Sequence, residues 1–119
     1  MVRFCYPSRL ETPVLDNVSF TIKPGEKVAI VGPSGAGKST IFHLILRYYD
    51  PTDGAVTFDG VRLTDADPSA VRRHIALVPQ DPVIFAASVR DNIRFGRPEA
   101  NDAEIEAAAE AAAIADFIR

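Results

Sequence analysis

Residues 27–40 read Lys-Val-Ala-Ile-Val-Gly-Pro-Ser-Gly-Ala-Gly-Lys-Ser-Thr. The last part of this stretch matches the pattern G-x-x-x-x-G-K-[ST], in which Gly32 and Gly37 are the two fixed glycines. The apolar, β-branched run at residues 27–31 predicts a short buried strand before the loop. An apolar helical pattern follows the loop and predicts a helix over about residues 38–48. The stretch therefore predicts a strand, a glycine-rich loop and a helix in direct succession.

The composition of this loop favours binding of a phosphate group. Its three glycines let the backbone curl and approach a ligand with no Cβ in the way. The curled amides form an anion nest, and the helix that follows adds free N–H groups and the positive end of its dipole. We expect Lys38 to reach the outer phosphates, Ser39 to ligate Mg²⁺ and Thr40 to reach an inner phosphate. The predicted phosphate-binding residues are Gly32, Pro33, Ser34, Gly35, Ala36, Gly37, Lys38, Ser39 and Thr40.

The bulk composition is that of a globular chain of 119 residues, enough for one small domain. Hydrophobic residues make up 47% and charged residues 24%, with a net charge of −3. This balance argues against a general nucleic-acid or membrane-surface binder. The single cysteine, Cys5, cannot form an internal disulfide, which fits a reducing compartment. No apolar run approaches the roughly 20 residues that span a bilayer, and the N-terminal residues lack the apolar segment of a signal peptide.

Periodicity and turn signals outside the loop predict a mixed α/β core with an antiparallel accessory sheet. Asp59-Gly60 predicts a two-residue hairpin turn. Asn101 and Glu104 form a capping-box pattern at the start of the last helix. The remaining patterns predict strands at residues 2–6, 14–22, 55–58, 61–63 and 75–78, and helices at residues 68–74 and from residue 87 or 88 to about 93.

Several short motifs, taken in this order along the chain, carry a family resemblance. They are Val2-Arg3-Phe4-Cys5-Tyr6-Pro7, Val14-Leu15-Asp16-Asn17-Val18-Ser19-Phe20, Pro24-Gly25-Glu26, the glycine-rich loop, Tyr48-Tyr49-Asp50-Pro51, Asp59-Gly60, Val78-Pro79-Gln80-Asp81-Pro82 and Asp91-Asn92-Ile93. In this order they resemble the nucleotide-binding domain of ATP-binding cassette (ABC) transporters, especially the exporter type that is fused to a transmembrane domain. The resemblance covers essentially the whole chain and implies a P-loop NTPase core.

The resemblance implies further site residues and the ligands ATP and Mg²⁺. Tyr6 matches the aromatic that stacks on adenine, and Gln80 matches the glutamine that brings its side-chain oxygen to Mg²⁺ and the attacking water. Lys38 and Gln80 are then the catalytic residues of this chain, and Ser39 and Gln80 the metal ligands. The residues themselves leave alternatives open, because Tyr6 also fits a core strand aromatic and Gln80 a solvated loop residue.

The resemblance also implies partners. The family pairs two nucleotide-binding domains around two ATP molecules and contacts the transmembrane domain through the loop at residues 80–95. The apolar triplet at residues 83–85 fits either the core or, for Phe85, the groove that receives the membrane domain. The expected location is the cytoplasmic face of a membrane, with this segment itself soluble, and we expect no nucleic-acid partner.

The sequence stops at residues 115–119, just upstream of where further motifs of the family would fall. A complete domain also has a Leu-Ser-Gly-Gly-Gln-type signature, an apolar strand that ends in Asp-Glu, and a later switch histidine. We therefore expect residues 1–119 to be about the first half of the domain, truncated before the helical signature region is complete. On its own this piece is expected to hydrolyse little or no ATP, and strands that would neighbour the phosphate-loop strand are missing.

Two other classes of function compete with this hypothesis. A stand-alone nucleotide kinase or GTPase also uses a phosphate loop, but the chain has no Asn-Lys-x-Asp base-reading motif and no arginine-rich lid. A non-catalytic nucleotide-binding fragment or dimerising partner is the third class. A test of base preference separates the GTPase class from the ATP-binding classes.

Overall fold

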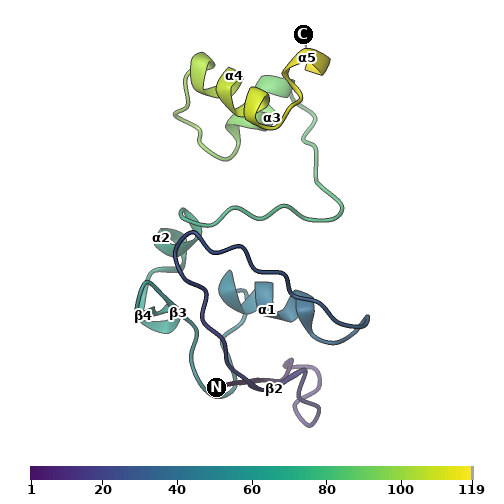
Figure 1. Ribbon diagram of the computed structural model, residues 1–119, viewed down its shortest axis with the longest axis vertical. Coiled ribbons are helices and arrows are strands. Elements are labelled where there is room, and N and C mark those ends of the chain that lie inside the picture. Colours follow the sequence, from purple (N-terminus) through teal and green to yellow (C-terminus); the bar gives the residue numbers. More distant parts are fainter. Residues whose placement is uncertain (119) are drawn as a thin grey trace. The chain divides into compact units, whose positions relative to one another are not determined.

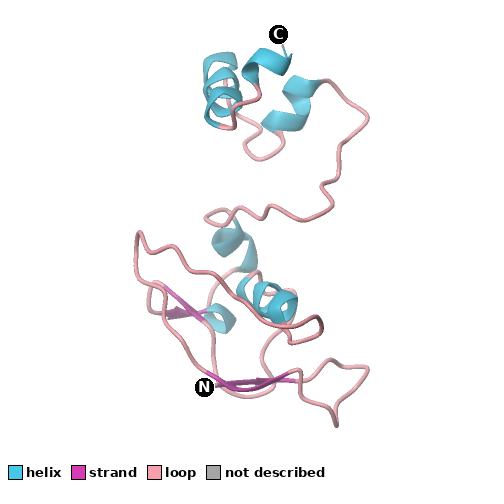
Figure 2. Cartoon of the chain, turned by 45° about the vertical axis from the view of Figure 1, so that its right-hand side comes forward, coloured by secondary structure: helices cyan, strands magenta, loops and turns pink. Residues whose placement is uncertain are grey.

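The computed structural model describes residues 1–118, which form two compact units, Met1–Leu77 and the segment from Val78 onward. The first unit combines four short strands with helices, and the second is helical (Figures 1 and 2). The strands are β1 (Val2–Phe4), β2 (Leu15–Val18), β3 (Thr57–Phe58) and β4 (Val61–Arg62). The helices are α1 (Lys38–Ile45), the 3₁₀ turn η1 (Leu63–Asp65), α2 (Pro68–Arg72), α3 (Val89–Arg94), α4 (Asp102–Ala111) and α5 (Ala115–Ile118).

The core of the first unit lies where the β1–β2 pair meets α1. Strands β1 and β2 are antiparallel, and Phe4 lies opposite Leu15 across the pair. Phe4, Leu15 and Leu44 are buried and form one cluster, with Phe4 only 2% exposed. The predicted strand at residues 2–6 and the predicted helix after the glycine-rich loop are confirmed, although both are shorter than expected. Burial of Leu44 fixes α1, and with it the loop that precedes the helix, against this sheet.

The predicted hairpin around Asp59-Gly60 is confirmed. Strands β3 and β4 pair antiparallel, with Phe58 opposite Val61. Asp59 has φ +48° and Gly60 has φ +80°, so both central residues lie in the left-handed region that a type I′ turn requires. Aspartate tolerates this region and glycine adopts it freely, which is why this dipeptide forms the turn.

Two predicted buried strands are not formed. Residues 27–31 and 75–78 carry no strand, and most of their apolar side chains are exposed, with Val31 at 86% and Val78 at 90%. The predicted strand at residues 14–22 also stops early, and Phe20 beyond it is 51% exposed. A strand needs a neighbour for its backbone N–H and C=O groups. Neither missing strand has one within the described residues, which contain only the β1–β2 and β3–β4 pairs. Of the predicted mixed α/β core with an antiparallel accessory sheet, the described residues therefore form helices and two separate antiparallel strand pairs.

Two arginines close the C-terminal end of α1. Arg72 on α2 donates from Nε to the Leu46 carbonyl (2.8 Å) and from a terminal nitrogen to the Arg47 carbonyl (2.9 Å). Arg47 in turn donates to the carbonyls of Leu63 and Ala66. Guanidinium groups at a helix C-terminus satisfy carbonyls that have no partner within the helix and complement its dipole. These bonds tie the C-terminal end of α1 to η1 and α2.

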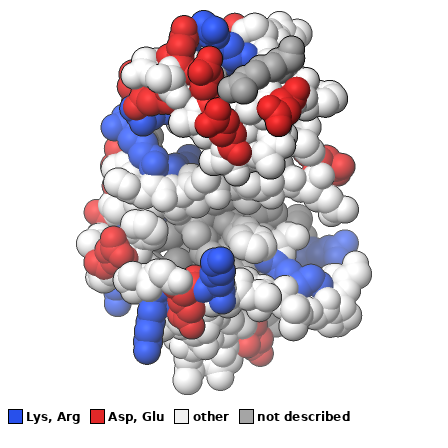
Figure 3. Space-filling view, turned by 45° about the horizontal axis from the view of Figure 1, so that its top comes forward, with Lys and Arg blue, Asp and Glu red and all other residues white. Residues whose placement is uncertain are grey.

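The second unit consists of α3, α4 and α5 and the loop that leads into them. In the space-filling view its acidic side chains lie among basic ones (Figure 3). Asp102 is paired with Arg90 (2.8 Å) and Arg94 (3.2 Å). Among residues 1–118, no helix has both the length and the apolar character that crossing a membrane requires.

The capping box predicted at the start of α4 is confirmed. The Asn101 side chain accepts a hydrogen bond from the Glu104 N–H (3.0 Å), and Glu104 accepts one from the Asn101 N–H (2.9 Å). Arg97 also donates to the Glu104 carboxylate. The hydrogen bond from the Asn101 N–H, followed by that from Arg97, holds the pKa of Glu104 below its usual range.

This lowered pKa predicts a pH-dependent stability of the helical unit. A carboxyl group whose pKa is lower in the folded state stabilises the fold above its unfolded pKa and loses this contribution as the pH falls through its folded pKa. We expect the free energy of unfolding to decrease as the pH falls below the ordinary value of 4.5. Urea unfolding, followed by circular dichroism at a series of pH values, measures this decrease.

The matched variants for this measurement are Glu104→Gln and Glu106→Gln, which each remove one glutamate from α4. Glu104→Gln should be less stable than the unmodified chain near neutral pH, and this difference should shrink in acid. Glu106→Gln controls for the loss of charge. A Glu104→Gln difference of constant size across the whole pH range would contradict the prediction.

Candidate functional site

The glycine-rich loop leads directly into α1 and leaves the start of this helix open. Gly37 is the N-cap residue, with φ +88°, and no side chain caps the helix at this end. The first N–H groups of a helix have no partner within it. Residues 32–36 of the loop are exposed, as is Ser39 in the first turn of the helix, whereas the Ala36 N–H already donates to the Pro33 carbonyl (3.2 Å). This arrangement provides hydrogen-bond donors and a positive dipole end for an anion.

Gly37 is required by both backbone conformation and space. Its φ of +88° lies in the left-handed region, where a side chain is strained. A Cβ atom there would lie 2.9 Å from Leu15 Cδ2 and 3.0 Å from the Val14 carbonyl oxygen. The loop therefore packs directly on β2, and this contact positions the start of α1.

The Lys38 side chain folds back over the loop. Its ammonium group donates to the carbonyl oxygens of Gly32 (2.5 Å) and Pro33 (2.6 Å). An ammonium group has three donors, and these two bonds use two of them. The backbone of Lys38 lies at the end of the loop, and its ammonium group lies at the beginning. The side chain therefore links the two ends of the loop and places a positive charge beside it.

Ser39 is the residue of the first unit that the sequence predicts to ligate Mg²⁺. Ser39 is exposed and lies in the first turn of α1, next to Lys38. Mg²⁺ prefers hard oxygen ligands and usually keeps several from water and phosphate. The Ser39 hydroxyl and the Gln80 amide oxygen fit this preference by chemistry.

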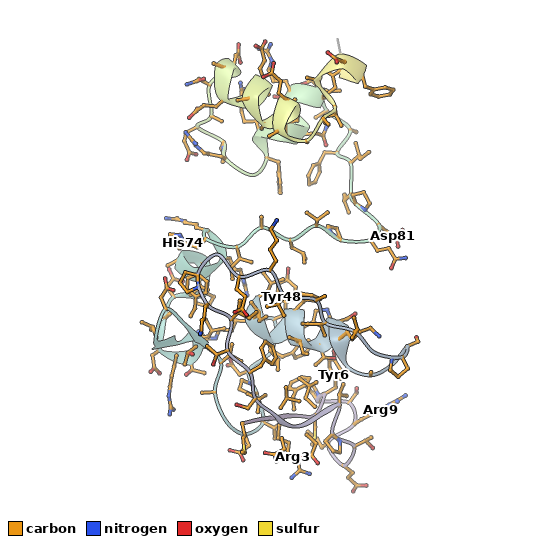
Figure 4. The ribbon with its side chains drawn as sticks, in the orientation of Figure 1. Arg3, Tyr6, Arg9, Tyr48, His74 and Asp81 are labelled. Atoms are coloured by element: carbon orange, nitrogen blue, oxygen red, sulfur yellow. The ribbon has the colours of Figure 1, made fainter. Side chains whose placement is uncertain are left out.

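Tyr6 lies against α1, two residues beyond the end of β1 (Figure 4). Its ring is partly buried and meets two other aromatic rings edge-on, Phe4 at 4.9 Å and Tyr49 at 5.2 Å between centroids. Its hydroxyl lies 2.9 Å from Thr40 Oγ1 and 3.2 Å from His43 Nδ1. Thr40 itself is only 4% exposed. The structure thus brings Tyr6 together with the helix that starts at the phosphate loop, and the phosphate contact of Thr40 stays a prediction.

Gln80 lies in the second unit, in an exposed loop. The expected buried strand before it is absent, as described above, and its predicted contacts with Mg²⁺ and water stay predictions. Of the apolar triplet that follows, Val83 (76%) and Ile84 (82%) are exposed and do not belong to the core. The ring of Phe85 contacts that of Phe95, with centroids 4.6 Å apart.

Two residues near these positions make contacts that the sequence analysis did not assign. Asn92 accepts from the Phe85 N–H (2.8 Å) and donates to the carbonyls of Phe85 and Ser88, so it holds the loop before α3. His43 contacts the Tyr6 hydroxyl. The sequence carries one indication of this contact of His43. His43 follows Thr40 by three positions on the same predicted helix, which places both residues on one face.

Comparisons with known proteins agree on one family. The family model described as "ABC transporter" matches residues 15–119. ATP-binding cassette sub-family B member 6 of Mus musculus is 50% identical over 117 residues, which cover 98% of this chain and 14% of that protein. Antigen peptide transporter 2 of Mus musculus is 47% identical over 98% of this chain and 17% of its own length. The solved structure of a bacterial Atm1-family ABC exporter with ATP bound matches with a TM-score of 0.90 and 45% identity, over 98% of this chain and 20% of that one.

Proposed function

This chain belongs to the ABC transporter family, and we propose that its glycine-rich loop binds the phosphates of Mg²⁺-ATP. The family resemblance expected from the sequence motifs is thereby confirmed, and with it a P-loop NTPase fold. One observation supports this proposal most directly. The Lys38 ammonium group lies at the exposed glycine-rich loop, and this loop leads into the start of α1, which no side chain caps. All three favour negative charge, and a triphosphate supplies it.

Each site residue has a role that its chemistry can fill. Lys38 neutralises the outer phosphates and supplies charge-assisted hydrogen bonds. The loop from Gly32 to Gly37 binds phosphate oxygens through its amides, and Ser39 and Gln80 are proposed to hold Mg²⁺, which neutralises phosphate charge during phosphoryl transfer. Gln80 is also proposed to orient the attacking water, because an amide accepts on one side and donates on the other.

Tyr6 is proposed to bind the base. Its ring is only partly buried, and its hydroxyl contacts Thr40 of α1, the helix that follows the phosphate loop. Stacking of a base on an aromatic ring contributes about 1–3 kcal/mol and tolerates different bases.

The whole protein is proposed to be an exporter driven by ATP hydrolysis. The chain spans 14% to 20% of the length of the relatives described above. One of them is named an exporter and another a peptide transporter. By analogy, we propose that two such nucleotide-binding domains pair around two ATP molecules at the cytoplasmic face of a membrane. The exposed loop within residues 80–95 is then the proposed contact with the transmembrane domain.

Binding of Mg²⁺-ATP, Mg²⁺-GTP and Mg²⁺-tripolyphosphate, measured by calorimetry on the whole protein that carries this sequence, tests the proposal. The unmodified protein should bind all three ligands. Strong selectivity for GTP would favour the GTPase class instead. Failure to bind both ATP and tripolyphosphate would overturn the proposed function.

Tyr6→Ala should weaken ATP binding by about 5- to 100-fold through the loss of stacking, while tripolyphosphate, which has no base, should bind as before. Phe20→Ala removes another aromatic ring of the first unit, one that is 51% exposed, and serves as the control. Because Tyr6 also packs on Phe4, circular dichroism must show that the variant is folded. Unchanged ATP affinity in a folded Tyr6→Ala variant would contradict the role of Tyr6.

A further inference from the structure

The hydroxyl of Tyr6 is held by two side chains of one helix. Thr40 Oγ1 lies 2.9 Å from it and His43 Nδ1 lies 3.2 Å from it. Both residues belong to α1 (Lys38–Ile45), three positions apart, so they lie on the same face of the helix. A tyrosine hydroxyl donates one hydrogen bond and accepts others, and a neutral imidazole nitrogen either donates or accepts. One hydroxyl therefore satisfies both contacts in either direction.

Packing and hydrogen bonding fix different properties of the Tyr6 ring. The edge-on contacts with Phe4 (79° between ring planes) and Tyr49 (88°) set the tilt of the ring. Neither Phe4 nor Tyr49 belongs to α1, so these contacts do not themselves tie the ring to that helix. The two hydrogen bonds end at defined atoms and so fix the position of the ring along α1.

His43 differs from Thr40 in that it lies outside the phosphate loop and the residues proposed to bind phosphate. Its side chain is partly buried and lies among Tyr6, Tyr48 and Tyr49, with ring centroids 5.9 Å from Tyr48 and 6.3 Å from Tyr49. These neighbours restrict the imidazole ring, so Nδ1 is directed at the Tyr6 hydroxyl. The helix that carries it begins at Lys38, which belongs to the phosphate site.

We propose that His43 is a positioning residue that sets the distance between the base-binding ring of Tyr6 and the phosphate loop. This inference rests on the proposed binding of ATP. In a nucleotide the base and the phosphates are joined covalently through the ribose, so both must bind within the reach of one molecule. A ring anchored to α1 lies at a constant distance from the start of that helix, where the phosphate site lies. A ligand without a base does not depend on this distance, so a substitution of His43 should not change the affinity for such a ligand.

Calorimetric titration of the whole protein with Mg²⁺-ATP and with Mg²⁺-tripolyphosphate tests the role of His43. His43→Leu should bind ATP about 2- to 10-fold more weakly, the effect of one lost hydrogen bond, and tripolyphosphate unchanged. His43→Asn places an amide near the position of Nδ1 and should recover most of the ATP affinity. His74→Leu, which changes the other histidine, an exposed one with its ring stacked on Phe58 at 6.4 Å, should leave both affinities unchanged.

A double-substitution cycle decides between positioning and general packing. Tyr6→Phe keeps the ring and removes the hydroxyl, so His43→Leu should have no further effect on ATP affinity when Tyr6→Phe is already present. Equal ATP affinity of His43→Leu and the unmodified protein would overturn the inference, as would equal losses for ATP and tripolyphosphate or independent effects in the cycle. Failure of the unmodified protein to bind either ligand would overturn the proposed function together with this inference.

Discussion

Lys38→Met is expected to weaken binding of Mg²⁺-ATP by about 10- to 100-fold, the range for hydrogen bonds to a charged group. Methionine keeps the length and apolar stem of the side chain but removes the ammonium group. The ammonium is the cation placed beside the loop amides, through its bonds to the Gly32 and Pro33 carbonyls. Tripolyphosphate should lose affinity by a similar factor, because the lost contacts are to phosphate and not to the base.

The control for Lys38→Met is Lys27→Met, which removes an exposed lysine from the same stretch of sequence. It lowers the net charge equally but should leave both affinities unchanged at moderate salt. Urea unfolding of both variants separates ligand effects from stability. If Lys38→Met bound both ligands as tightly as Lys27→Met, the assignment of the phosphate site would be wrong.

Gly37→Ala is expected to lower the free energy of unfolding of the first unit by about 2–5 kcal/mol, which combines left-handed strain with overpacking. Its new Cβ atom would lie 2.9 Å from Leu15 Cδ2 and 3.0 Å from the Val14 carbonyl oxygen. Leu15 belongs to the core cluster with Phe4 and Leu44, so the side chain cannot move without a cost to the core. Urea unfolding measures the change.

Gly35→Ala provides the matched control, because the two glycines share a left-handed backbone but not the crowding. Gly35 has φ +80°, and nothing lies within 4 Å of the position that its Cβ would take. It should therefore show only the cost of the left-handed backbone, about 1–2 kcal/mol. Equal losses of stability for the two variants would contradict the direct packing of the loop on β2.

The parts of the fold that the sequence predicted correctly have local signals. The turn at Asp59-Gly60, the capping box of Asn101 and Glu104, and the glycine-rich loop before α1 are each specified by residues within a few positions of one another. Turn and cap chemistry act at short range, so they are readable without knowing the rest of the fold. The family motifs, read in order, then identified the ABC transporter family.

The parts that the sequence did not predict depend on distant partners. Residues 27–31 have the composition of a buried strand, but a strand also needs a neighbour, and composition does not say whether one is present. Arg72 donates to the carbonyl of Leu46, 26 positions away, and Tyr6 meets His43 at a separation of 37. No periodicity within one element indicates such contacts, so the support for the Tyr6 ring became visible only in the structure.

The bonds from Lys38 to the Gly32 and Pro33 carbonyls have a consequence for the thermodynamics of recognition. Because the side chain already ties the two ends of the loop together, the loop loses its conformational freedom when the chain folds and not when an anion arrives. Such preorganisation raises affinity by removing an entropic cost from the association step. The same bonds also have a cost for binding. An incoming anion competes with the two carbonyl oxygens for the Lys38 ammonium, so its net attraction to that ammonium is smaller than it would be for a free side chain.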